Sequence, residues 1–159
     1  MYFFRKSIAP IVVVIACCVL VVSCGESREV QCTKLTQFVT KGNYLIDSQR
    51  NSNDIATTKK LARDLNRTAK QLEGLRITDN KLKEFQSESV KSFREMGQAL
   101  GDIGKAFEAG NRAATSIEGR EQIQKAQAEL VKAGKLANQA AESQDAVTEK
   151  LIDYCTIER

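Results

Sequence analysis

The fold is decided by the stretch from Ile123 to Tyr154, which reads IQKAQAELVKAGKLANQAAESQDAVTEKLIDY. Apolar and small residues recur along it in alternating steps of three and four, which is the heptad pattern of a helix packed against neighbouring helices. These inward positions are Ile123, Ala126, Leu130, Ala133, Ala137, Ala140, Gln144, Val147, Leu151 and Tyr154. The pattern predicts one long helix over about 118–154.

Helical periodicity also dominates the chain before this stretch, and no segment alternates in the manner of a strand. Three more helices are predicted over about 29–49, 54–73 and 79–114. The first two are separated by the run Asn51-Ser52-Asn53-Asp54, which offers side chains that cap a helix N-terminus. We expect Phe93 and Phe107 on the inward face of the third helix. The predicted fold class is all-α.

The N-terminal segment is organised like a secretory signal. Arg5 and Lys6 make it positively charged, and an uncharged run of 15 residues follows from Ile8 to Val22. A membrane-spanning helix needs about 20 apolar residues, so this run is short for a permanent anchor. An uncleaved membrane anchor is the alternative interpretation.

The end of this segment, Val21-Val22-Ser23-Cys24, resembles the lipobox of bacterial lipoproteins. The resemblance implies cleavage before Cys24 and lipidation of its thiol, so that the protein is held at a membrane by lipid. We therefore divide the chain into a signal peptide (1–23), a short lipid-tethered linker (24–31) and a helical bundle domain (32–159). The localisation implied is the cell membrane or outer membrane, facing the periplasm or another extracytoplasmic space.

The cysteines predict a disulfide and, through it, the topology. Cys17 and Cys18 leave with the signal and Cys24 takes the lipid, so Cys32 and Cys155 remain as a pair in an oxidising compartment. Bridged Cα atoms lie within about 7 Å of each other, so both ends of the domain must meet. An even number of helices achieves this, and we expect an up-down-up-down four-helix bundle.

The predicted helices differ in length, and the third and fourth should extend about 20 Å beyond the others as a hairpin centred near Ile117. Several glycines fall in this hairpin, although each glycine inside a helix costs about 1 kcal/mol relative to alanine. They indicate either close approach of helices or a frayed tip, and the sequence leaves both open.

The composition excludes several classes of function. Loss of Arg5 and Lys6 reduces the 24 basic residues to 22, against 20 acidic ones, which is too even a balance to favour nucleic acid binding. The chain contains no histidine, so it lacks the residue on which most hydrolytic triads and many metal sites depend. Glu84, Glu88 and Glu95 share part of a helix, but nearby lysines and Arg94 favour a solvated face. We expect no catalytic residues, no metal site, no cofactor and no enzymatic activity.

One basic surface is a candidate contact site. Lys59, Arg63, Arg67 and Lys70 recur at spacings of four, four and three along the second predicted helix. Such a stripe is either a solvated helix face or a contact for an anionic partner or lipid headgroups.

The mature part resembles small helical lipoproteins of cyanobacteria that have no assigned function. The resemblance is carried by short motifs: Gln31-Cys32-Thr33-Lys34-Leu35, Lys41-Gly42-Asn43, Leu75-Arg76-Ile77-Thr78-Asp79 and Tyr154-Cys155. It implies the fold and export, and it implies no activity.

The leading functional hypothesis is a lipid-anchored extracytoplasmic helical module that binds or scaffolds another protein, for example as an accessory subunit of a membrane complex. The alternative is a carrier of an apolar small molecule or lipid between the helices. The sequence leaves open the partner's identity and the oligomeric state. Seven residues, 25–31, join Cys24 to Cys32 and reach at most about 25 Å, so the disulfide end should lie near the bilayer. Basic residues expected at that end are Lys70, Arg76, Lys81, Lys83 and Lys150.

Overall fold

The computed structural model describes residues 26–49 and 54–156. The predicted signal peptide and Cys24 lie outside the described residues. Within residues 26–49 and 54–156, no helix combines the length and the apolar character needed to cross a membrane.

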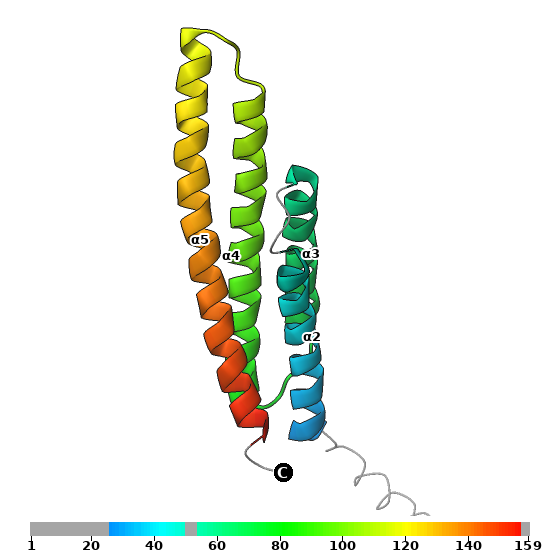
Figure 1. The fold of residues 1–159 in the computed structure, drawn as a ribbon. Helices are drawn as coiled ribbons and strands as arrows, with labels where there is room; N and C mark the ends of the chain where they lie inside the picture. Colours follow the sequence, from blue (N-terminus) through cyan, green and yellow to red (C-terminus); the bar gives the residue numbers. More distant parts are fainter. Residues whose placement is uncertain (1–25, 50–53, 157–159) are drawn as a thin grey trace, which may run out of the picture.

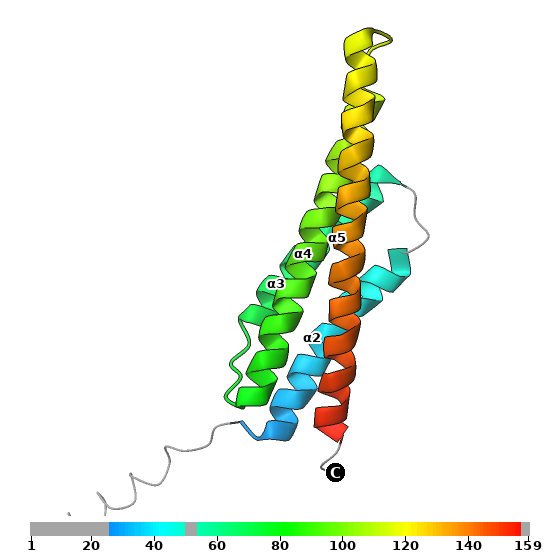
Figure 2. The same cartoon turned by 90° about the vertical axis from the view of Figure 1, so that its left-hand side faces the viewer.

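All regular secondary structure in the described chain is helical, and the helices form the predicted bundle. Its helices are α2 (Arg28–Gln49), α3 (Ile55–Glu73), α4 (Asn80–Asn111) and α5 (Ile117–Thr156). They run up, down, up and down, so that the start of α2, the α3–α4 loop and the end of α5 meet at one end (Figures 1 and 2). We call this end the base. The predicted all-α fold class and up-down-up-down topology are confirmed.

Polar side chains start three of the helices. Asp54 accepts a hydrogen bond from the backbone N–H of Thr57 at 2.8 Å, and Asp79 accepts one from Leu82 at 2.9 Å. Ser116 accepts one from the N–H of Gly119 at 3.1 Å, which begins α5. Each cap satisfies a backbone donor that the first turn of a helix leaves unpaired.

The turn between α4 and α5 comes earlier than predicted. The third helix was expected to reach Ala114, but α4 ends at Asn111, and α5 begins at Ile117. The reason lies in the turn itself, which folds back so closely that a Cβ added at Gly119 would lie 1.7 Å from the carbonyl oxygen of Ala114. If α4 continued as a helix to Ala114, the chain could not fold back against Gly119 in this way.

The core is concentrated in the lower part of the molecule, where four helices pack together. It is built mainly from Leu, Val, Ile and Phe side chains: Leu35, Val39, Leu61, Leu65, Leu72, Ile77, Leu82, Phe85, Val90, Phe93, Met96, Val147 and Leu151. α2 approaches α4 closely there. A Cβ added at Gly42 would lie only 2.3 Å from Cζ of Phe93, so the absence of a side chain at Gly42 permits the approach.

The two long helices continue past α2, as the length argument predicted. α5 has 40 residues and α4 has 32, whereas α2 has 22 and α3 has 19. The α4–α5 hairpin therefore projects beyond the α2–α3 pair (Figure 1). We call residues 100–138 the distal hairpin.

The expectation that Phe107 and Ile123 are buried is wrong. Phe107 is 44% exposed and Ile123 is 39% exposed. Both continue the inward pattern of their helices, but α2 ends at Gln49 and does not reach them.

Candidate functional site

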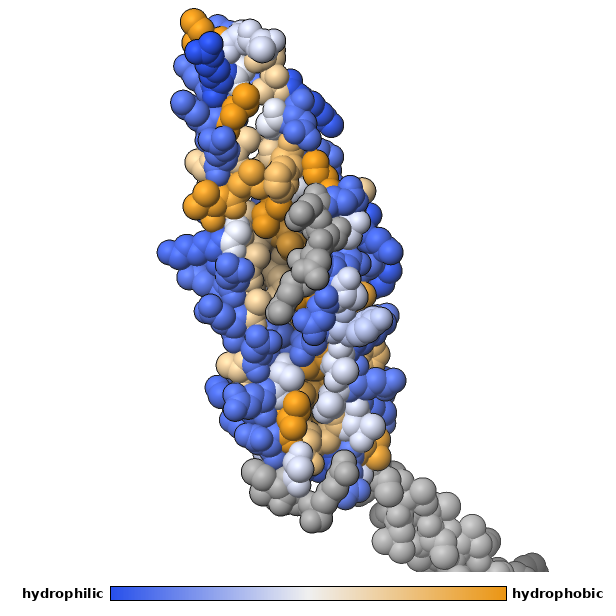
Figure 3. All heavy atoms as spheres, in the orientation of Figure 1, coloured by the Kyte–Doolittle hydropathy of each residue, from blue (hydrophilic) through white to orange (hydrophobic). Residues whose placement is uncertain are grey.

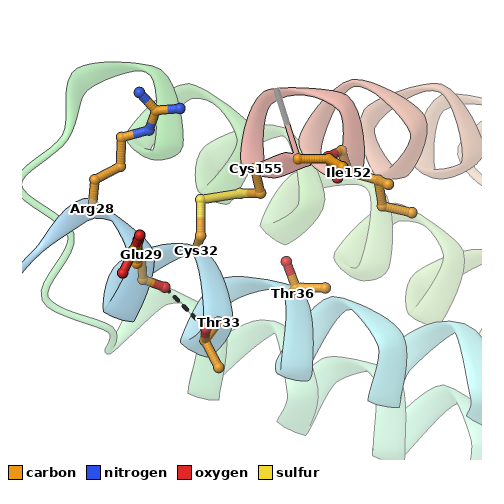
Figure 4. A pocket seen from close by; sticks show the side chains of 8 residues that line it. Arg28, Glu29, Cys32, Thr33, Thr36, Ile152 and Cys155 are labelled. Carbon is orange, nitrogen blue, oxygen red and sulfur yellow. Dashed lines mark hydrogen bonds between the residues drawn. A yellow bond between two sulfur atoms is a disulfide. The ribbon is translucent and has the colours of Figure 1, made fainter. Parts of the chain in front are cut away.

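The base is closed by the predicted disulfide. Cys32 on α2 and Cys155 on α5 are bridged across 123 residues of sequence, with Cα atoms 5.8 Å apart (Figure 4). The bond joins the first and last helices of the bundle. The predicted pairing of these two cysteines is confirmed.

Beside the disulfide, Gln31 ties α2 to the α3–α4 loop. Its side chain is 2% exposed. Its Nε2 donates to the carbonyl oxygen of Glu26 at 2.6 Å and to Oγ1 of Thr78 at 2.9 Å. Its Oε1 accepts from the backbone N–H groups of Thr78 at 2.7 Å and Asp79 at 3.1 Å. Sequence reasoning assigned Gln31 no role, since an isolated glutamine carries no pattern that distinguishes a buried amide from a solvated one.

Tyr154 ties the end of α5 to the same loop. Its hydroxyl donates to Oδ2 of Asp79 at 3.1 Å, and the Arg28 guanidinium lies 4.3 Å from the centre of its ring. Hydrogen bonds from the Leu82 backbone and from Tyr154 hold the pKa of Asp79 below its usual value, against the opposing effect of partial burial. Asp79 is therefore both the α4 cap and the anchor for α5. We call Arg28, Gln31, Asp79, Tyr154 and the disulfide the base clasp.

An open groove of about 610 Å³ runs along the disulfide on the outer face of the base (Figure 4). It is lined by Arg28, Glu29, Cys32, Thr33, Thr36, Ile152, Cys155 and Thr156. The Thr33 hydroxyl donates to the Glu29 carbonyl at 2.9 Å, so this polar group is already engaged within α2. Among the residues that line the groove, no nucleophilic side chain is paired with a proton acceptor that could activate it.

The four residues of the predicted basic stripe have different surroundings. Lys59 is half-buried against Gly104 and forms an ion pair with Glu108, which lowers the pKa of that carboxyl. Arg67 lies 3.3 Å from the carboxylate of Asp64. Arg63 and Lys70 are exposed. Lys59 thus fastens α3 to α4, and the exposed basic charge of the stripe lies on Arg63, Arg67 and Lys70.

The basic residues expected at the base are exposed. Arg76 lies in the α3–α4 loop, Lys81 and Lys83 in the first turns of α4, and Lys150 near the end of α5. Lys81 pairs with Glu84 at 2.5 Å, and its ammonium lies 5.3 Å from the centre of the Phe85 ring. These side chains surround the end of the molecule at which the chain enters α2.

The distal hairpin carries the most exposed apolar surface of the long helices. Figure 3 shows apolar side chains gathered over the upper parts of α4 and α5. The large exposed apolar residues there are Phe107, Ile117, Ile123, Val131 and Leu136. Large exposed apolar patches are a feature of contact sites, so the distal hairpin is a candidate contact surface.

One face of α5 within the hairpin carries no charge. At 3.6 residues per turn, the charged residues between 123 and 141 fall on one half of the helix, and the α2-facing half has none. The uncharged half, which we call the uncharged strip, consists of Ile123, Gln127, Leu130, Val131, Gly134, Ala137, Asn138 and Ala141. Below it, α5 contacts α2, where Asn43 donates to Thr148 at 3.1 Å. The strip therefore continues the surface that α2 covers. Sequence reasoning located the apolar seam but assumed that it was covered throughout.

A pocket of about 290 Å³ lies where α2 stops. Its walls come from all four helices: Ile46, Gln49, Thr57, Thr58, Leu61, Met96, Leu100, Ala137, Asn138 and Ala141. Oε1 of Gln49 is buried there and has no hydrogen-bond partner among the described residues. An unpaired buried acceptor is costly, and residues 50–53, which follow Gln49 in the chain, lie outside the described residues.

The acidic residues of α4 do not assemble a metal site. Glu84 is paired with Lys81, and Glu95 lies 3.9 Å from Lys91, both on exposed surface. Across the part of the chain that the structure describes, no three His, Cys, Asp or Glu side chains are arranged to hold a metal ion.

Comparison with known proteins gives no assignment: no protein-family model matches the chain, and neither a curated protein nor a solved structure is significantly similar to it. The resemblance to cyanobacterial lipoproteins stays a prediction.

Proposed function

We propose that this protein is a bacterial lipoprotein that is acylated on Cys24, stands on its base at the outer face of a membrane, and offers its distal hairpin to another protein. The observation that carries the proposal is the contrast between the two ends of the bundle. The base is closed by a disulfide and polar contacts, whereas the distal hairpin exposes Phe107, Ile123 and Val131.

The chain length between the lipid site and the bundle supports this orientation. Because α2 begins at Arg28, only residues 25–27 separate Cys24 from the helix. Three extended residues reach about 10 Å, so a lipid on Cys24 would hold the base against the headgroups. α5 has 40 residues and is about 60 Å long, which would carry the tip of the hairpin far from that bilayer.

Basic residues at the base fit the same orientation. Arg76, Lys81, Lys83 and Lys150 are exposed at this end, and each basic residue near an anionic membrane surface contributes about 1 kcal/mol of attraction. The lipid would supply the attachment, and these side chains would set the tilt of the bundle.

The proposal is tested with two paired variants of the full chain in its membrane. A photo-crosslinking residue is placed at Val131 in the uncharged strip or, as the control, at exposed Lys125 on the opposite side of α5. We expect crosslinked protein from position 131 alone. Changing Lys81 and Lys83 to Glu should weaken binding to anionic vesicles and spare this crosslink. Crosslinking lost in the basal variant and retained after Phe107→Asp would mean that the base carries the function.

A second candidate function rests on the pocket at the end of α2. Its walls combine apolar side chains such as Met96 and Leu100 with polar ones such as Thr57, which fits a small, mainly apolar molecule that carries a polar group. Native mass spectrometry of the protein released gently from membranes distinguishes the two. A bound small molecule lost in Ala137→Phe, which fills the pocket, would favour the carrier. A chain that carries no bound molecule would leave binding of another protein as the function.

A further inference from the structure

We propose that the Cys32–Cys155 disulfide is a redox latch. Its reduction by a dithiol releases α2 from the bundle, while α3, α4 and α5 stay packed together. Three features of the structure carry this inference: the limited packing of α2, unpaired polar atoms where α2 meets α5, and the open groove beside the disulfide. The latch depends neither on lipid at Cys24 nor on a partner of the distal hairpin.

The first feature is the packing of α2. It packs mainly against α3 and makes smaller contacts with α4 and α5, whereas α4 packs extensively against both α3 and α5 (Figure 1). Five of the 22 residues of α2 are buried, and the large apolar side chains among these five are Leu35 and Val39. Because α4 lies between α3 and α5, these three helices keep their shared core when α2 leaves.

The sequence of α2 is also a poor helix former on its own. Gly42 and Asn43 lie within it, and six further residues are β-branched: Val30, Thr33, Thr36, Val39, Thr40 and Ile46. Such residues have low intrinsic helix propensity, and isolated helices of this length are marginal in water even for alanine-rich sequences. A released α2 therefore loses its helical structure.

The second feature is a polar layer between α2 and α5. The Thr148 hydroxyl on α5 accepts hydrogen bonds from Nδ2 of Asn43 at 3.1 Å and from Nε2 of Gln144 at 3.2 Å. The amide oxygens of the same two residues, Oδ1 of Asn43 and Oε1 of Gln144, are buried and have no hydrogen-bond partner among the described residues. Buried acceptors without partners destabilise the docked position of α2, because both would bind water after its release.

Hydrogen bonds at the base also hold α2, but they oppose its release less than the disulfide does. Gln31 bonds to Thr78 and to the backbone of Asp79. Water replaces each of these partners once α2 leaves, so the net contribution of each hydrogen bond is small. The covalent bond between Cys32 and Cys155 has no such replacement, and release of α2 requires its reduction.

The third feature is access to the disulfide. The groove of about 610 Å³ runs along it on the outer face of the base (Figure 4). Cys155 is half-buried, whereas Cys32 is buried, so the sulfur of Cys155 is the one we expect a thiolate to attack. The groove thus lets a reductant reach the bond while the bundle is folded.

Reduction by a dithiol is a two-step thiol–disulfide exchange. One thiolate of the dithiol attacks Sγ of Cys155, and the sulfur of Cys32 leaves as a thiolate. The second thiol of the dithiol loses its proton and attacks its neighbouring sulfur in the mixed disulfide, so that Cys155 leaves. Both cysteines then take up protons. The dithiol is oxidised to a disulfide, and its two electrons reduce the bond between Cys32 and Cys155.

Release of α2 would uncover part of the core. The ring of Phe93 lies against Gly42 of α2, and Phe107 continues the same face of α4 in the exposed distal hairpin. Once α2 leaves, Phe93 becomes accessible and the exposed apolar seam extends from the distal hairpin toward the base. Reduction would therefore enlarge the surface that the bundle offers to another molecule.

The test compares hydrogen exchange of the full chain, purified in detergent, with and without dithiothreitol. After reduction we expect amides in residues 28–49 to exchange about tenfold faster or more, and residues 61–72 and 82–96 to stay protected. Circular dichroism should lose about a fifth of its helical signal, which is the share of α2 among the four helices. The matched control, Cys32→Ser with Cys155→Ser, should show the reduced pattern with and without dithiothreitol. Unchanged protection of α2, or equal acceleration in all four helices, overturns the inference.

Two further comparisons test the polar layer and the groove. After reduction, Asn43→Leu with Gln144→Met should keep α2 more protected than in the wild type, because the unpaired acceptors are gone. Thr33→Trp fills the groove and should slow reduction by dithiothreitol several-fold, whereas Thr40→Trp, at an exposed position of α2 outside the groove, should not. Equal reduction rates in both tryptophan variants would overturn direct attack through the groove. Equal exchange in reduced wild type and the Asn43–Gln144 variant would overturn the role of the polar layer in the release.

Discussion

Phe93 and Phe107 lie on the same face of α4, fourteen residues apart, yet Phe93 is fully buried beneath α2 and Phe107 is exposed. The ring of Phe93 lies against Gly42 of α2, while α2 ends at Gln49 before it reaches the level of Phe107. One apolar seam is therefore covered along its lower part, which forms the core, and exposed along its upper part, on the distal hairpin.

The disulfide should provide a large part of the stability. Reduction removes a link that closes 123 residues, and the chain-entropy model gives a loss of about 4–5 kcal/mol as an upper value. Chemical denaturation of the wild type with and without reductant measures this loss. Cys32→Ser and Cys155→Ser should each reproduce it, and the double variant should lose no more than either. Additive losses would show that the two cysteines act separately.

Replacing glycine with alanine should lower the stability of the protein at Gly42 in α2 and raise it at Gly101 in α4. Gly42→Ala places a methyl group against the Phe93 ring, and overpacking of this kind costs about 1–3 kcal/mol. Gly101→Ala meets no atom within 4 Å and should raise the free energy of unfolding by about 0.5–1 kcal/mol through helix propensity. Thermal melts compare the two variants. Equal effects would mean that α2 does not approach α4 at Gly42.

Acid should lower the stability of the disulfide end of the bundle, because Asp79 loses its charge. Its pKa in the folded protein lies below the usual 3.8, so its stabilising effect is complete above that value and is lost as the pH falls through the lowered one. Asp79→Asn should be less stable than the wild type at neutral pH and should lose less of its stability on acidification. Tyr154→Phe removes one of the two hydrogen-bond donors to Asp79, and its stability should lie between that of the wild type and that of Asp79→Asn. Melting curves between pH 7 and pH 2 that run parallel for all three proteins would contradict this role.

The turn at the hairpin tip should depend on Gly119. An alanine there would place its Cβ 1.7 Å from the Ala114 carbonyl oxygen, so the turn must rearrange. Hydrogen exchange should accelerate around residues 112–126 and stay unchanged at the base. Gly110→Ala is the matched control, because its Cβ would lie 3.8 Å from Cβ of Ala126, an ordinary contact. Faster exchange throughout the protein in Gly119→Ala would show that the tip and the core unfold together.

Local patterns predicted most of the fold. The periodicity gave four helices, the Cys32–Cys155 pair required an even number of them, and Asp54 caps α3 as the polar run before that helix indicates. The turn after α4 was misplaced because its cap, Ser116, and its glycine lie within a sequence that otherwise reads as helix. The exposure of Phe107 was missed because periodicity identifies an apolar face and does not reveal whether another helix covers it.

The base clasp was only partly predictable for a similar reason. The disulfide follows from counting cysteines, but the contacts of Gln31 with Thr78 and of Tyr154 with Asp79 join residues 47 and 75 positions apart. Such pairings depend on how the α3–α4 loop meets the two chain ends in space. No local sequence pattern encodes them.

The intact mass of the protein extracted from the host membrane tests the central claim most directly. The account predicts a chain that begins at Cys24 and carries lipid on that residue. Cys24→Ser should leave the precursor unprocessed by the lipoprotein peptidase and without lipid. A chain that retains residues 1–23, or one that begins at Cys24 without lipid, would contradict the claim that this bundle is held at the membrane by an acylated cysteine.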